Sequence, residues 1–256
     1  MDGDLAFLRM LAVYGQEHER DLLRQAAASA SFPIEIVEAG DASSARAALA
    51  GNNIDIAFLD CAIAPPERAA FISAARAAAQ PPFVILTATA GSAAANLSAE
   101  EASVDGVVAK PTGLDEARDL VERCIRARRK SQVLLVDDSA TMRSIVRKIL
   151  ASSRFPLEVS EAQEGVEALR QIGSGKFDIV FLDYNMPGLN GVETLAEIKR
   201  QYPRLEVVMI TSTAEEAVAE RARAAGAAAF IKKPFYPSDI DAVLHCIFGL
   251  RPAKKN

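Results

Sequence analysis

The stretch "FLDYNMPGLN" (Phe181–Asn190) begins as an apolar run and reaches an acid at its third residue, Asp183. An earlier stretch, "FLDCAIAPPE" (Phe58–Glu67), begins with the same three letters and places Asp60 123 positions before Asp183. A short apolar run that ends in an acid is typical of a buried strand that stops at a polar edge. The pair of stretches therefore raises the question of whether the chain contains one fold twice.

Other pairs of segments keep nearly the same offset along the chain. They are Met10–Gln16 with Val133–Ser139, Phe83–Thr89 with Val207–Thr213, and Lys110-Pro111 with Lys233-Pro234. Four matches in the same order indicate an internal duplication, because chance supplies isolated matches only. We therefore expect two domains, residues 1–130 and residues 131–256.

Short β-branched runs alternate with longer helical patterns in each copy. For the second copy this predicts strands over 132–137, 157–160, 178–182, 205–210 and 229–232, and helices over 139–151, 163–172, 191–201, 214–225 and 237–247. For the first copy it predicts strands over 9–13, 34–37, 54–59, 83–86 and 107–109. Such alternation favours an α/β fold with a parallel sheet. Five strands and five helices in each copy predict two flavodoxin-like, doubly wound domains, with strand order 2-1-3-4-5 and helices on both faces.

Composition limits the class of protein. The 256 residues carry a net charge of −5 and three scattered cysteines, Cys61, Cys124 and Cys246. An acidic chain has no global field to attract nucleic acid, and scattered cysteines favour a reducing compartment over a disulfide framework. No apolar run is long enough for a membrane span, and the N-terminus is unlike a signal peptide. We expect a cytoplasmic protein without membrane segments.

The predicted strand ends of the second copy carry the polar groups. Asp137 and Asp138 follow its first strand, Asp183 its third, Thr211 its fourth, and Lys233 its fifth. The carboxyl ends of parallel strands meet at one edge, where doubly wound folds bind their ligands. Three neighbouring carboxylates repel one another unless a cation lies among them, and oxygen ligands suit Mg²⁺. A nucleophile, a metal and a lysine together are the equipment for phosphoryl transfer onto a carboxylate.

The segments "VLLVDDSATMR", "FLDYNMPGLNGVE", "VVMITST" and "GAAAFIKKPF" resemble the receiver (CheY-like) domain of two-component response regulators. The resemblance covers essentially all of residues 131–250. It implies that Asp183 accepts a phosphoryl group, and that Mg²⁺ is bound by Asp137, Asp138, Asp183 and the backbone carbonyl of Asn185. It further implies three supporting roles: Thr211 as the switch hydroxyl, Phe230 as the switch aromatic and Lys233, before a cis Pro234, as the phosphate-binding lysine.

The first copy keeps only part of this pattern. Asp60, Thr87 and Lys110 occupy the positions of the phosphoacceptor, the switch hydroxyl and the lysine. Tyr14 and Gly15 stand where the acidic pair should be, and without those acids little remains to hold Mg²⁺. We expect a degenerate receiver that does not accept phosphate in the usual way, although Glu17 could reach back as a substitute ligand.

The resemblance predicts a tandem-receiver response regulator of a phosphorelay, not an enzyme beyond self-dephosphorylation. Its partners would be a sensor histidine kinase or phosphotransfer protein and a downstream protein. Because only "LRPAKKN" follows Gly249, we expect no DNA-binding output domain. A phosphorylation-independent scaffold is an alternative. A metal-dependent phosphohydrolase is a second alternative, disfavoured because Asn185 stands where such enzymes place a general acid. An FMN-binding flavodoxin-like module is a third, disfavoured because two acids follow the first strand.

The same resemblance suggests a homodimer. Receivers often pair through the face formed by the fourth helix, fifth strand and fifth helix. In the second copy the fourth-helix pattern carries charges of both signs, which suit symmetric ion pairs and a solvated helix equally well. These residues are Glu215, Glu216, Glu220, Arg221 and Arg223.

Overall fold

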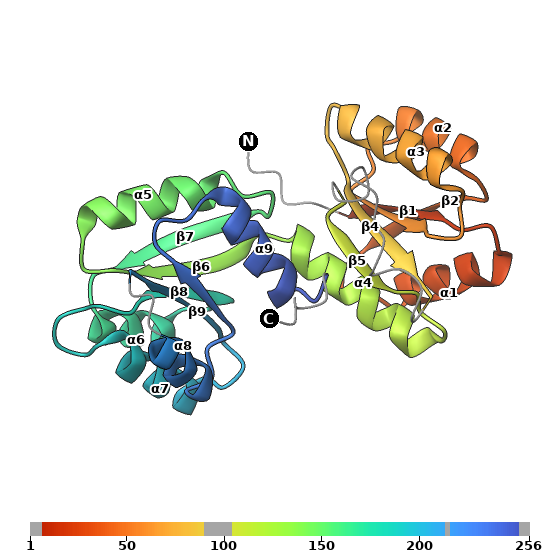
Figure 1. The fold of residues 1–256 in the computed structure, drawn as a ribbon. Coiled ribbons are helices and arrows are strands. Elements are labelled where there is room, and N and C mark those ends of the chain that lie inside the picture. Colours follow the sequence, from red (N-terminus) through yellow and green to blue (C-terminus); the bar gives the residue numbers. More distant parts are fainter. Residues whose placement is uncertain (1–6, 90–103, 213–215, 251–256) are drawn as a thin grey trace. The chain divides into compact units, whose positions relative to one another are not determined.

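The structure is a computed structural model that describes residues 7–89, 104–212 and 216–250. Its chain forms two compact α/β units that divide between Arg128 and Arg129. Figure 1 shows a sheet with flanking helices in each unit. Of the described residues, 248–250 group with the first unit, whereas those between 129 and 247 form the second.

The first unit contains a five-stranded parallel sheet in the order β2-β1-β3-β4-β5. The strands are β1 (Leu8–Val13), β2 (Ile34–Ala39), β3 (Ile56–Asp60), β4 (Phe83–Ala88) and β5 (Gly106–Ala109). The helices among its described residues are α1 (Glu17–Ala28), α2 (Ala42–Gly51), α3 (Pro65–Ala77) and α4 (Leu114–Arg128). Helix α1 packs beside α4 on one face, and α2 packs beside α3 on the other (Figure 1). The stretch between β4 and β5, where the fifth expected helix would lie, includes residues 90–103, which are outside the described part of the chain.

The second unit repeats this topology, with strand order β7-β6-β8-β9-β10. Its strands are β6 (Ser131–Val136), β7 (Leu157–Ala162), β8 (Ile179–Asp183), β9 (Glu206–Thr211) and β10 (Ala229–Lys232). Its helices are α5 (Ala140–Ala151), α6 (Gly165–Ser174), α7 (Gly191–Gln201), α8 (Glu216–Ala224) and α9 (Pro237–Ile247). Helices α5 and α9 cover one face, and α6, α7 and α8 cover the other (Figure 1). The two doubly wound sheets predicted from the sequence are confirmed.

The central strands β3 and β8 explain why the two Phe-Leu-Asp stretches determine the fold. Every residue of both strands is buried, as a strand covered by helices on both faces requires. Phe58 and Phe181 have no exposed surface, and burying such a side chain stabilises a fold by about 2–3 kcal/mol. Each strand therefore anchors its sheet and carries its terminal aspartate to the edge.

Local signals set the element ends close to the expected positions. Ser139 begins α5 by accepting a hydrogen bond from the backbone N–H of Met142. Asn190 begins α7 with a capping box, in which its side chain accepts from the backbone of Glu193 and the Glu193 side chain accepts in return. Such caps satisfy backbone donors that a first helical turn leaves unpaired. Strand β10 has the expected bounds, and the ends of the other strands differ from expectation by one or two residues.

The short segment after α9, residues 248–250, groups with the first unit, although the sequence placed it in the second domain. The backbone N–H of Val107 in β5 donates to the Leu250 carbonyl at 2.8 Å. Arg123 in α4 donates to the carbonyl of Gly249, whose φ of +64° turns the chain. Phe248 and Leu250 are buried, and the hydrogen bonds from β5 and α4 hold this segment to the first unit.

No helix among the described residues is long and apolar enough to cross a membrane.

Candidate functional site

The functional residues predicted for the second unit meet at one edge of its sheet. Asp137 follows β6, Asp183 ends β8, Thr211 ends β9, and Lys233 directly follows β10. Because these four strands are parallel and adjacent, their carboxyl ends present the four residues together. The topology alone therefore assembles groups that lie up to 96 positions apart in the chain.

Three carboxylates form the centre of this edge. Asp137, Asp138 and Asp183 each offer an oxygen, and these oxygens all lie within 4.8 Å of one another. Asp137 and Asp183 are 2% and 5% exposed, whereas Asp138 lies in solvent. Hard oxygen ligands around one point, two of them buried and one open to water, fit Mg²⁺, which keeps several of its waters when it binds protein. No comparable group of acids exists among the described residues of the first unit.

Lys233 connects two of these acids. Its Nζ lies 2.8 Å from Asp183 Oδ1 and 2.9 Å from Asp137 Oδ2. Burial acts to lower the pKa of Lys233, but its hydrogen bonds to the two carboxylates outweigh that effect and raise it. The ammonium therefore stays charged at neutral pH and supplies a fixed positive charge.

Burial raises the pKa of Asp183 above its ordinary value, and the neighbouring charge of Asp137 adds to the effect. The Lys233 ammonium and the backbone N–H of Asn185 both act in the opposite direction. Because the effect of burial prevails, the charged form of Asp183 is destabilised unless further positive charge is near. A cation bound at this point would stabilise it.

The loop after Asp183 is held close to the site. The backbone N–H of Gly191 donates to the Tyr184 carbonyl at 3.1 Å. A Cβ at Gly191 would lie only 2.3 Å from the Asp183 carbonyl oxygen, so only glycine allows this approach. The Asn185 amide donates to Ser212 Oγ at 3.3 Å.

Two further residues of the predicted site differ in burial. Thr211 has no exposed surface, and its carbonyl accepts a hydrogen bond from the Lys233 backbone at 2.7 Å. Phe230 is half-buried and packs against the core of the second unit. The Lys233–Pro234 peptide bond is cis, as the resemblance implies.

The corresponding edge of the first unit is built differently. Asp60 is 4% exposed and Thr87 is fully buried, as in the second unit. Lys110 Nζ, however, lies 2.7 Å from Asp60 Oδ2 and 2.6 Å from Glu19 Oε1. Burial acts to lower the pKa of Lys110, and its hydrogen bonds to both carboxylates raise it overall. One ammonium thus fills the space between the two acids. Glu17, the substitute ligand considered from the sequence, is exposed.

Tyr14 occupies the position that Asp137 holds in the second unit. Its ring is 1% exposed, and the Lys110 ammonium lies 5.4 Å from the ring centroid. Burial raises the pKa of the Tyr14 phenol well above its ordinary value, so the phenol remains neutral. The first unit therefore offers an aromatic face where the second offers a carboxylate.

Comparisons with known proteins identify the second unit. The family model described as "Response regulator receiver domain" matches residues 133–245. Chemotaxis protein CheY-3 of Vibrio cholerae serotype O1 is 37% identical over 119 residues, which are 46% of this chain and 91% of that protein. The chain belongs to the response regulator receiver family. Chemotaxis protein CheY of Listeria monocytogenes is 38% identical over 104 residues, which are 41% of this chain and 87% of that protein.

One solved structure resembles the receiver chain over both of its units. It is described as a "probable two-component system response regulator/GGDEF domain protein" and is 25% identical. The match has a TM-score of 0.52 and covers 95% of this chain and 99% of that chain. The resemblance therefore extends beyond the receiver that the family model matches to the fold of the first unit.

The sequence did not reveal every residue of these sites. No sequence motif predicts a role for Glu19, Arg143 or Glu161. Arg143 contacts the backbone of Asp137, and Glu161 contacts Arg143. The offset of 123 was a usable signal for this pair, because Arg20 and Glu38 stand at the matching positions of the first unit.

Proposed function

We propose that the second unit accepts a phosphoryl group on Asp183 from the phosphohistidine of a sensor kinase or phosphotransfer protein. A carboxylate oxygen of Asp183 forms the new bond to phosphorus as the bond between phosphorus and the donor imidazole breaks. The observation that carries the proposal is the convergence of three carboxylates and the Lys233 ammonium on one point. This set of groups suits the transfer of a phosphoryl group better than any other reaction considered.

Each charged group of the site would have a role in binding Mg²⁺ or the phosphoryl group. Bound Mg²⁺ would be held by the carboxylates of Asp137, Asp138 and Asp183, and it would screen the incoming phosphoryl oxygens from them. The backbone carbonyl of Asn185 is the fourth protein ligand that we propose. Lys233 would then leave its pairing with Asp183 and stabilise the phosphoryl oxygens, because the ammonium already lies 2.8 Å from the acceptor oxygen.

The proposed signal begins with the charge that aspartyl phosphate adds. A phosphoryl group brings nearly two negative charges to a buried edge. The hydroxyl of Thr211 would turn toward the new acceptor oxygens, and half-buried Phe230 would fill the space left behind. The surface formed by α8, β10 and α9 would then change shape for a downstream protein.

We propose that the first unit is a degenerate receiver that serves assembly or specificity. Lys110 pairs with Asp60 and Glu19, and no group of three acids like that of the second unit lies among the described residues of the first unit, which supports this proposal because little negative charge remains there to hold a metal. The same pairing favours the phosphorylation-independent scaffold as a second candidate function, for this unit only.

The proposed homodimer rests on the charged residues of α8. Glu220, Arg221 and Arg223 are exposed on α8, and Arg221 donates to the Tyr184 hydroxyl at 3.0 Å. Glu215 and the side chain of Glu216 lie outside the described part of the chain. Light scattering with and without phosphodonor tests the dimer, and an unchanged monomer in both states would remove it.

The proposed function is tested by labelling the full chain with acetyl phosphate and Mg²⁺, followed by peptide mass spectrometry. We expect phosphate on Asp183, none on Asp60, and loss of label in Asp183→Asn. Asp60→Asn is the matched control and should label as the wild type does. Label on Asp60 would overturn the degenerate first receiver. Steady turnover of diverse phosphoesters would favour the phosphohydrolase instead.

A further inference from the structure

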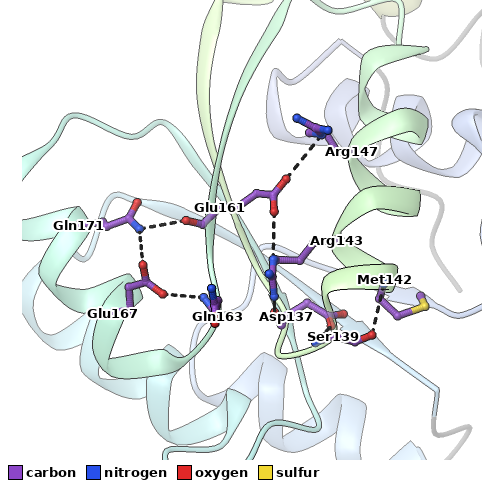
Figure 2. Close-up of polar contacts among 9 residues, drawn as sticks. All are labelled: Asp137, Ser139, Met142, Arg143, Arg147, Glu161, Gln163, Glu167 and Gln171. Atoms are coloured by element: carbon purple, nitrogen blue, oxygen red, sulfur yellow. Dashed lines mark hydrogen bonds and ion pairs between the residues drawn. The ribbon is translucent and has the colours of Figure 1, made fainter.

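A partly buried hydrogen-bond network connects the backbone of Asp137 to side chains of α5, β7 and α6 (Figure 2). Arg143 Nη1 in α5 donates to the Asp137 carbonyl at 2.8 Å, and Arg143 Nε donates to Glu161 Oε2 in β7 at 3.0 Å. Arg147 Nε lies 3.5 Å from the other oxygen of Glu161. Gln171 in α6 donates to the Glu161 carbonyl at 2.9 Å. Glu161 is thereby connected to helices on both faces of the sheet.

The network fixes Asp137 because Arg143 has little freedom. Its side chain is 9% exposed, and a buried guanidinium is tolerated only when its charge and its N–H groups are satisfied. The planar guanidinium presents two N–H donors at a fixed angle, so the positions of Glu161 and the Asp137 carbonyl are coupled.

The carboxylate of Asp137 is held at its two oxygens by other groups. Oδ1 accepts from the backbone N–H of Ser139 at 2.9 Å, and Oδ2 accepts from Lys233 at 2.9 Å. With Arg143 on the carbonyl, Asp137 is restrained from three directions. Its backbone cannot rotate to follow a cation without loss of the Arg143 contact.

The first unit contains a corresponding network around a residue that is not an acid. Arg20 donates to the Tyr14 carbonyl, and Arg20 Nε lies 3.4 Å from Glu38. Arg24 donates to Glu38 at 2.7 Å. All four residues stand 123 positions before their counterparts in the second unit. Because this network also occurs around Tyr14, which is not an acid, it can stabilise the fold without a metal. The effect of the network on metal affinity must therefore be measured separately from its effect on stability.

We propose that Arg143 and Glu161 are positioning residues that orient Asp137 for a divalent cation. The inference rests on the proposed metal site of the second unit and adds two residues that do not touch the metal. Groups that orient metal ligands typically change metal affinity by 10- to 100-fold when they are removed. We expect Glu161→Gln to weaken cation binding about tenfold, because the neutral amide holds the guanidinium less firmly.

The test compares Glu161→Gln with Glu38→Gln in the full chain. Mn²⁺ is titrated as the probe, with free Mn²⁺ measured by electron paramagnetic resonance, and a thermal melt without metal measures the stability of each variant. We expect Glu161→Gln to raise the Mn²⁺ dissociation constant about tenfold, with Glu38→Gln equal to the wild type. Arg143→Lys, which keeps the charge but loses the paired donors, should show the same weakening.

Each outcome decides a different point. Equal Mn²⁺ binding by Glu161→Gln and the wild type would overturn the positioning role. Equal weakening by Glu38→Gln would also overturn it, because the effect would then be one of general stability. A wild type that binds Mn²⁺ no better than Asp183→Asn would instead remove the metal site of the proposed function. Should Arg143→Lys fail to fold, the Glu161→Gln and Glu38→Gln pair still decides, since neither substitution changes side-chain size.

Discussion

Lys110 and Glu19 form an ion pair of 2.6 Å in the first unit, and the second unit has no counterpart to it because Met142 occupies the position of Glu19. The consequence is a difference in local charge. In the second unit three carboxylates lie together and one ammonium pairs with two of them, which leaves negative charge for a cation to neutralise. In the first unit the Lys110 ammonium faces two carboxylates and leaves less excess charge. The described residues of the first unit therefore offer less negative charge to attract a divalent cation.

This difference predicts that Mg²⁺ affects a variant of Lys233 but not the matching variant of Lys110. Lys233→Met leaves Asp137 and Asp183 buried without a cation, and Lys110→Met does the same to Asp60 and Glu19. Each substitution should lower the free energy of unfolding by about 2 kcal/mol, less than for a fully buried pair because both lysines keep some contact with water. Mg²⁺ should restore Lys233→Met in large part and leave Lys110→Met unchanged. Urea unfolding with and without Mg²⁺ measures both.

The wild type and Lys232→Met are the controls for these lysines. Lys232 is exposed, so its loss should change the free energy of unfolding by less than about 0.5 kcal/mol. Rescue of Lys110→Met by Mg²⁺ would show that the first unit can bind a cation, contrary to the proposal.

Asp183→Asn should stabilise the metal-free protein at neutral pH. Burial raises the pKa of Asp183 above the unfolded value of 3.8, so the folded wild type carries a charge that the unfolded chain carries more easily. A raised pKa contributes stability below the unfolded pKa, and that contribution is lost as pH rises through the folded pKa. The stability advantage of the variant should therefore be largest near neutral pH and should shrink as the pH falls toward the unfolded pKa of 3.8.

Melting temperatures of Asp183→Asn and the wild type, measured without metal from neutral to acidic pH, test the sign of the stability difference. Addition of Mg²⁺ should reverse the order, because only the wild type retains all three carboxylates. A variant less stable than the wild type at neutral pH in the absence of metal would contradict the argument.

Gly191→Ala should damage the site more than its position in a helix suggests. Its new Cβ would lie 2.3 Å from the Asp183 carbonyl oxygen and 2.7 Å from the Tyr184 Cα, so the loop that carries the acceptor must shift. We expect a loss of about 2–3 kcal/mol in the free energy of unfolding and slower labelling of Asp183. Gly188→Ala is the matched control. It has φ of +75° but open space around its Cβ, so it should cost about 1–2 kcal/mol and leave labelling intact.

The sequence predicted the fold because its strongest signals are local. Each buried strand is a short β-branched or aromatic run, and parallel strands bring their final residues to the same edge. Asp137, Asp183 and Lys233 could thus be placed together without any knowledge of side-chain contacts. The caps at Ser139 and Asn190 are local signals of the same kind.

The residues that the sequence did not reveal act across elements through the reach of a side chain. Glu19 lies on α1 and contacts Lys110 after β5, and no spacing rule distinguishes it from exposed Glu17. Arg143 is one helical turn beyond the acidic pair and resembles any charged helix residue. The packing of α5 against β7, not the pattern of the chain, turns its guanidinium toward Glu161 and the Asp137 carbonyl.

Three substitutions should give the first unit an acidic site like that of the second. The substitutions Tyr14→Asp and Gly15→Asp supply the missing acidic pair, and Glu19→Met gives the position the residue found in the second unit. All are placed in an Asp183→Asn background, so that any phosphate must lie on Asp60. We expect acetyl phosphate and Mg²⁺ to label Asp60 in the triple variant, and more weakly in the chain that keeps Glu19.

The physical reason is competition for Lys110. While Glu19 remains, its ion pair with Lys110 competes with incoming phosphoryl oxygens for the same ammonium. Removal of the buried Tyr14 ring should lower the free energy of unfolding by about 3 kcal/mol, so circular dichroism must first show that the variant is folded. Mass spectrometry then locates the phosphate. A folded triple variant without label would mean that the first unit lacks more than its acids and its free lysine, and the segment around Cys61 and Ile63 after Asp60 would be the next difference to exchange.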